Sequence, residues 1–324
     1  MFNKVVFLSF SAETDQSIFS GDFWKKSISK YPFVAMRTMG AEIGSKMEKT
    51  EGFGVAFPEL NISELVYEGA DFILMNYSIE EKKVPKKNLE RRIKELTQKL
   101  KDELKVEKLD KEQRTTIRES AYTKELVRTP EVLYEFHILI NKRGRWLAID
   151  ATSAKSVDRC TEMLRKAVSS LPVVILSALD ASEAFTDWVQ LKDIPDTVYL
   201  GHDCKLGGIG DDSLASYKKQ ELHCSEIQTN ISNDKLICEI GLQLKVDSGD
   251  SEVLLPFVVN QNLAVSGIKW KFDSEEMATE DVKSLSENKL VVTNAYLSYV
   301  YDFIKTHIVE RHSGSTNEFI PTGI

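Results

Sequence analysis

The sequence predicts an α+β protein with mixed or antiparallel sheets and a projecting helical hairpin. Strand-like and helical runs follow one another without the regular alternation of a doubly wound fold. Short polar turns join neighbouring strand-like runs, as residues 141–145 do between 133–140 and 146–150. A charged segment with helical periodicity, residues 82–128, separates two of the strand-like runs.

The first half of the chain contains two strands followed by two helices. Residues 1–10 and 71–77 are rich in apolar and aromatic residues, as strands are. Pro85 suits the first turn of a helix, where its missing N–H costs nothing. That helix carries one apolar stripe, formed by Leu89, Ile93, Leu96, Leu100 and Leu104. Asp110 and Gln113 resemble a capping box that begins a second helix, which extends toward Val127.

The second half contains further strands and two more helices. Thr152 or Ser153 can cap a helix whose apolar positions extend to Val168. Pro172 lies in a short buried strand, 171–176. Further strands are expected at 236–244, 253–259 and 268–272, and a last helix at 294–308. We expect a central α+β domain (1–78 with 129–178), a basic helical insertion (79–128) and a C-terminal α+β domain (179–324).

Charge is strongly segregated along the chain. Residues 82–128 hold 16 Lys or Arg and nine Asp or Glu, a net charge of +7. The whole chain is −8, so the remainder carries −15. Such segregation favours a surface for polyanions, although charged helices are more often ordinary solvated surface. We keep both interpretations open for this segment.

Length and composition predict a cytoplasmic globular protein of two or three domains. The 324 residues are 42% hydrophobic and 28% charged. No apolar run approaches the roughly 20 residues that a membrane span needs. The four cysteines form no C-x-x-C pair, so reduced thiols are expected rather than a zinc site at His202, Cys204, His223 and Cys224.

The sequence also offers possible catalytic groups, each with a plainer explanation. Ser153 and Lys155 could form a nucleophile pair, but Ser153 is better explained as a helix cap. Asp180, Glu183 and Asp187 would share one helix face, yet they lack the E-x-K element of common nucleases. His137 is expected on a sheet face without a catalytic role. We therefore assign no catalytic residue, no metal ligand and no cofactor.

Three segments together resemble the RdgC family of bacterial recombination-associated proteins. They are D-A-T-S-A-K at 150–155 with S-L-P-V-V-I-L-S at 170–177, T-D-W-V at 186–189, and K-K-Q-E-L at 218–222. Weaker similarities are Glu80–Lys82 with Pro85, and K-W-K-F at 269–272. One departure is Pro130, which stands where compared members carry an aromatic residue two positions after the arginine corresponding to Arg128.

The resemblance implies a ring-forming homodimer that binds double-stranded DNA with little sequence preference. It also implies nucleoid association and a role in limiting the RecA recombinase. The alternatives are a metal-dependent DNA exonuclease, because the family has carried that label, and an inhibitor that binds RecA without DNA. Lys269 and Lys271 would share one face of their strand. The candidate DNA-binding residues are Lys82, Arg91, Lys94, Arg114, Arg118, Lys124, Arg128, Lys218, Lys219, Gln220, Lys269 and Lys271.

Overall fold

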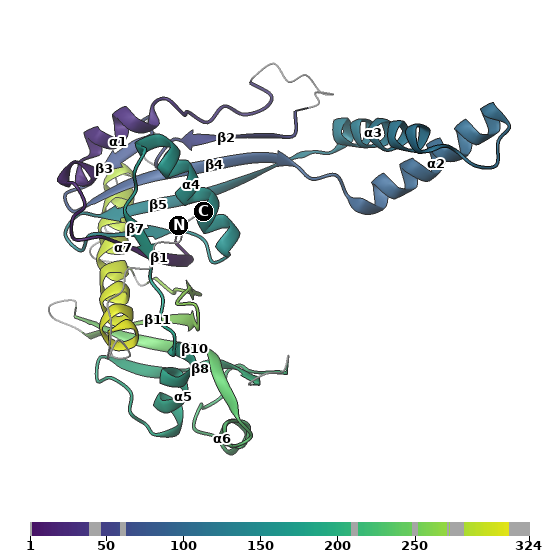
Figure 1. Cartoon of the computed structure of the whole chain (residues 1–324). Helices are drawn as coiled ribbons and strands as arrows, with labels where there is room; N and C mark the ends of the chain where they lie inside the picture. Colours follow the sequence, from purple (N-terminus) through teal and green to yellow (C-terminus); the bar gives the residue numbers. More distant parts are fainter. Residues whose placement is uncertain are drawn as a thin grey trace.

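A long antiparallel sheet organises the molecule, as the computed structural model shows for residues 2–38, 47–58, 63–208, 213–247, 252–270, 272 and 282–310 (Figure 1). Strand β3 (Val66–Glu68) pairs with β4, and β7 (Val173–Ile175) pairs with β1. The main path runs in the order β2 (Lys49–Gly54), β4 (Phe72–Lys82), β5 (Glu131–Asn141), β6 (Trp146–Ile149), β1 (Lys4–Phe10), β12 (Val265–Ser266), β11 (Glu252–Asn260), β10 (Lys235–Asp247), β8 (Val198–Gly208) and β9 (Leu214–Tyr217).

The sheet has two parts, which meet where β1 pairs with β12. We call β1 to β7 the N-terminal sheet and β8 to β12 the C-terminal sheet. Because β1 pairs with β6 along one edge and with both β7 and β12 along the other, backbone hydrogen bonds continue from one part into the next. The predicted domain boundary near residue 178 lies between β7 and β8, and the domain division itself stays a prediction.

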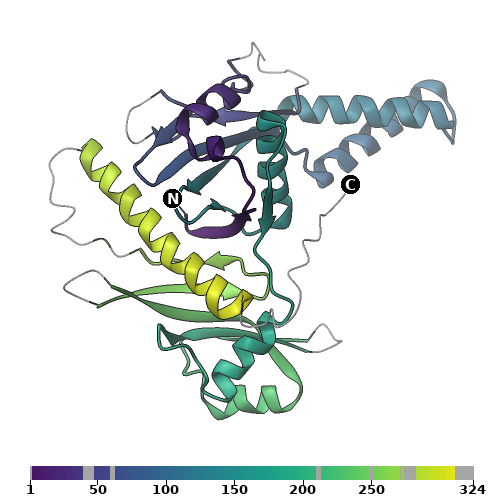
Figure 2. The ribbon, with the colours of Figure 1, turned by 60° about the vertical axis from the view of Figure 1, so that its left-hand side comes forward.

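Helices cover both faces of the N-terminal sheet. Helices α1 (Gly21–Ile28), which follows a 3₁₀ turn (Gln16–Phe19), and α4 (Ala154–Val168) pack on one face. There the Trp24 indole is fully buried and donates to the Ile18 carbonyl at 2.7 Å. Helix α7 (Val282–Ile304), which continues as a π-helical turn (Lys305–Val309), crosses the other face (Figure 2).

Polar contacts fix α7 on the N-terminal sheet. The hydroxyls of Ser9 and Tyr301 lie 2.8 Å apart, and the Tyr301 ring stacks on Trp146 with centroids 5.5 Å apart. Buried Asn141 donates to the Asn294 side-chain oxygen at 3.0 Å. The C-terminal part of α7 then packs with α5 (Ala181–Gln190) and α6 (Ser225–Ser232) on one face of the C-terminal sheet, forming a single core.

Two helices project from the end of β4 and β5, away from the rest of the molecule (Figure 1). They are α2 (Lys86–Leu104) and α3 (Lys111–Arg128), and they lie side by side; we call residues 86–128 the arm. Asp110 accepts a hydrogen bond from the Gln113 amide at 2.8 Å, and Gln113 bonds back at 3.1 Å. The predicted capping box is therefore confirmed.

The predicted α+β class is confirmed, and the structure corrects three predicted elements. The strand predicted as buried over 171–176 is the short β7, in which Val174 and Ile175 are exposed. The last helix begins at Val282, well before the predicted residue 294. The strand predicted at 268–272 is absent from the described residues of that range; the strand is β12, a few residues earlier, and Lys271 lies outside the described residues. Among the helices that the structure describes, none is long and apolar enough to cross a membrane.

Candidate nucleic-acid interface

The arm grows directly out of the sheet. Strands β4 and β5 stay paired without interruption from Phe72 opposite Asn141 to Lys82 opposite Glu131. The helices begin four residues after Lys82 and end three residues before Glu131. A continuous ladder of backbone hydrogen bonds restricts the directions that a short connection can take, so the sheet positions the arm.

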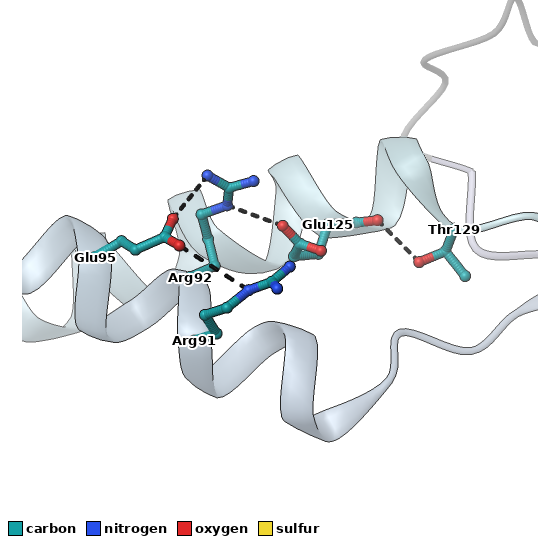
Figure 3. Close-up of polar contacts among 5 residues, drawn as sticks. All are labelled: Arg91, Arg92, Glu95, Glu125 and Thr129. Carbon is teal, nitrogen blue, oxygen red and sulfur yellow. Dashed lines mark hydrogen bonds and ion pairs between the residues drawn. The ribbon is translucent and has the colours of Figure 1, made fainter.

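A partly buried ion-pair network fastens the two helices to each other (Figure 3). Arg92 of α2 donates from Nε to Oε1 of Glu125 in α3 at 2.9 Å, and this bond raises the pKa of Arg92. Glu125 is only 6% exposed. Glu95 lies 3.1 Å from Nη1 of Arg92 and 4.0 Å from Nε of Arg91. An acceptor buried this deeply needs its donor, so the network stabilises the contact between the helices.

Ion pairs compensate part of the positive charge at the start of the basic segment. Within residues 82–128, five cations form ion pairs: Lys82, Lys83, Lys86, Arg91 and Arg92. All five lie at the start of the segment, beside the sheet. Across the described part of the chain, the other eleven have no carboxylate within 4.0 Å; they are Lys87, Lys94, Lys99, Lys101, Lys105, Lys108, Lys111, Arg114, Arg118, Lys124 and Arg128.

Most of the arm residues predicted to bind DNA belong to this uncompensated set. Lys94, Arg114, Arg118, Lys124 and Arg128 are all exposed. Cations without a carboxylate partner keep their full charge for a polyanion. The exposed faces of the arm are therefore the most suitable surface in the described structure for a row of phosphates.

Two predicted residues are placed differently. Lys82 is 8% exposed within the sheet and lies 3.7 Å from Glu131, so we remove it from the candidate surface. Arg91 is exposed, but it shares Glu95 with Arg92. Sequence reasoning counted both as available charges, because no local pattern shows which cation meets a carboxylate on another element. For the same reason it missed the role of Glu125.

The predicted loop contact after β9 is only partly accessible. Lys218 and Lys219 are exposed, and the Lys219 backbone N–H donates to Asp203 at 2.9 Å in a left-handed conformation. Gln220 was expected to be exposed, but its amide donates to the Cys224 sulfur at 3.0 Å and the Glu226 carboxylate at 3.3 Å. Lys219 is therefore the better phosphate contact of the two.

Lys269 and Trp270, the other predicted contact region, lie beside β11 of the C-terminal sheet. Lys269 is exposed, and its backbone N–H donates to the Pro256 carbonyl at 3.0 Å. Trp270 turns to the opposite side, where its ring stacks on Tyr296 with centroids 6.2 Å apart. Lys269 and Trp270 thus differ in exposure as predicted, but they lie beside β11 without forming the predicted strand, and Lys271 is outside the described residues.

The possible catalytic groups have structural partners. Ser153 caps α4 through its hydroxyl, which accepts from the Ser156 amide at 3.2 Å. His137 lies 3.7 Å from Asp150, which also accepts the Phe2 backbone N–H at 2.9 Å.

The acidic residues predicted on α5 do not converge on a metal position. Glu183 and Asp187 line a cavity of about 260 Å³ together with Asp234 and Lys235, while Asp180 precedes the helix. Within the described ranges no three His, Cys, Asp or Glu side chains gather in a way that could hold a metal ion.

Comparison with known proteins supports one family over most of the chain. The family described as "Putative exonuclease, RdgC" matches residues 37–298. A protein of Pasteurella multocida is 25% identical over 267 residues, covering 81% of this chain and 84% of that protein. A protein of Actinobacillus pleuropneumoniae serotype 3 is 27% identical over 238 residues, covering 71% and 74%. Both are named "Recombination-associated protein RdgC".

Proposed function

Because the chain belongs to the RdgC family, we propose that it acts in recombination as a protein that binds double-stranded DNA without sequence preference. In this proposal a homodimeric ring surrounds the duplex and restrains the RecA recombinase. The observation that carries the proposal is the set of eleven uncompensated cations on an arm that projects from an acidic molecule. Phosphate contacts of this kind give affinity without reading bases.

Salt titration tests the proposal. Each phosphate contact releases counterions, so log affinity should fall linearly with log salt, by about 0.9 per contact. Replacing Arg114 and Arg118 with Ala should reduce that slope by roughly two. The matched control replaces Lys86 and Arg91, two cations of the same arm that already have carboxylate partners. The control should change the slope far less, although it removes the same formal charge.

Two outcomes would contradict the proposal. A duplex affinity that does not depend on salt would remove the electrostatic surface. Equal effects of the two double variants would show that ion pairing on the arm does not select the contacts. A duplex of unrelated sequence should give the same slopes, because the contacts read the DNA backbone.

Restraint of RecA should follow DNA binding. The Arg114/Arg118 variant should lose inhibition of RecA-driven strand exchange in proportion to its lost duplex affinity. A protein that inhibits by binding RecA itself would keep inhibiting at salt concentrations that abolish DNA binding. That result would move the proposal to a protein–protein inhibitor.

An exonuclease is the second candidate, favoured by the family description. Incubating labelled linear and circular duplex with Mg²⁺ or Mn²⁺ distinguishes it from a binding protein. Loss of the linear substrate alone, abolished by Ala at Glu183 and Asp187, would favour the enzyme. Retarded migration of intact DNA would favour the binding protein.

A further inference from the structure

The C-terminal sheet has one covered and one open face. Its covered side chains, such as Leu242, Leu255 and Phe257, belong to the core beneath α5, α6 and α7. Alternate residues on the same strands point the other way. In the described part of the chain, no helix packs on that second face. Tyr199 of β8 lies on it and is 47% exposed.

A straight row of side chains crosses this open face. Tyr199 pairs with Gln243 of β10, and Gln243 pairs with Pro256 of β11. The Lys269 backbone N–H bonds to the Pro256 carbonyl at 3.0 Å, which places exposed Lys269 at the far end of the row. Three strand spacings separate the aromatic ring from the lysine, a span of about 14 Å.

The backbones of β8 and β10 approach each other closely beside the row. Gly201 and Gly241 lie next to each other on the two strands, and a Cβ built on Gly201 would sit 2.9 Å from the Gly241 backbone. A side chain at position 201 would therefore collide with the neighbouring strand. Glycine inside a strand often marks close approach of a ligand or another backbone.

A cation accompanies the exposed ring. The ammonium group of Lys245, two residues after Gln243 on the same face of β10, lies 4.2 Å from the centroid of the Tyr199 ring. The cation–π contact orients the ring and leaves nearly half of the side chain in solvent. Lys245 and Lys269 therefore provide positive charge near the two ends of the row.

We propose that this open face binds an unpaired nucleic-acid strand, with one base stacked on Tyr199 and phosphates near Lys245 and Lys269. Aromatic side chains on open sheets stack exposed bases, and basic groups hold the connecting backbone. A duplex hides its base faces within its own stack, so Tyr199 selects single strands. The surface differs from the arm, and each proposal can fail while the other stands.

The experiment measures two ligands on each variant of the full chain. The ligands are a thymidine oligonucleotide of about 16 nucleotides and a mixed-sequence duplex. Tyr199→Ala should weaken oligonucleotide binding roughly tenfold and leave duplex binding unchanged. Tyr199→Phe keeps the ring and should bind the oligonucleotide like the unaltered protein. The Arg114/Arg118 double variant should show the opposite selectivity.

The controls separate the possible results. Circular dichroism checks that Tyr199→Ala folds. If it does not, Lys269→Ala, which changes an exposed side chain at the other end of the row, should weaken oligonucleotide binding and tests the same site. Unchanged oligonucleotide affinity in Tyr199→Ala, or none in the unaltered protein, would overturn the proposal. A changed mass by light scattering with unchanged oligonucleotide binding would also overturn it, because the face would then contact a second copy. If the unaltered protein does not bind the duplex, that result would instead refute the proposed function.

Discussion

Cys160 and Cys204 lie inside the two hydrophobic cores. Burial raises the pKa of Cys204 to about 12, and it raises that of Cys160 further. Since the thiolate is the reactive form, its population at neutral pH should be about a thousandfold below that of an ordinary cysteine. Neither residue should be alkylated by iodoacetamide in the native protein, as read by peptide mass spectrometry.

The denatured protein is the control, because all four cysteines should then react. Rapid native modification of Cys204 would contradict the placement of β8 against α5 and α6. The comparison also tests the reduced, unpaired state of the cysteines. It needs no substitution and therefore leaves the fold undisturbed.

At the level of single residues, the sequence located the basic segment but did not show which of its cations are exposed. Lys82 and Lys94 are the same residue type in the same basic segment, yet one is enclosed beside Glu131 and the other is exposed. Pairing depends on which elements meet in space, and a charge count cannot contain that information. Gln220 was predicted to be exposed for the same reason, since its partner Glu226 lies on the following helix.

At the scale of elements, the capping box at Asp110 gives a direct prediction. Asp110→Ala removes the side-chain acceptor of the Gln113 amide in the first turn of α3, which should cost about 1 kcal/mol at that helix end. Hydrogen exchange in the first turn of α3 should then accelerate roughly fivefold. Asp110→Asn is the matched control, because it removes the charge and keeps a good cap. Equal acceleration in both variants would assign the effect to charge instead.

Elements with local signals were predictable, and those defined by distant partners were not. The apolar stripe of α2 and the cap of α3 lie within a few residues of their own helices, so both helices form where expected. Strand β12 needs β1 and β11 as partners, and it forms at Val265–Ser266 instead of 268–272. The early turns of α7 mix polar and apolar residues, so periodicity there did not reveal the helix.

At the scale of the whole molecule, one sheet connects two distant surfaces. The arm extends from the β4–β5 end, and the open face of the C-terminal sheet lies beyond β12 (Figure 1). Helix α7 contacts both sheets through residues such as Asn294 and Phe303. A duplex site on one part and a single-strand site on the other would suit DNA in which both forms meet.

The last prediction concerns assembly. One chain with a single arm does not enclose a duplex, so the proposed ring requires a second copy, and closed two-fold symmetry would join like surfaces. Light scattering at micromolar concentration should give twice the chain mass of 36.7 kDa. A ring around DNA should also survive a high-salt wash on a closed circle and slide off the same molecule after linearisation, because topology rather than charge then retains it. A monomer that binds duplex fully, or equal loss from both DNA forms, would contradict the ring and leave the arm as an open binding surface.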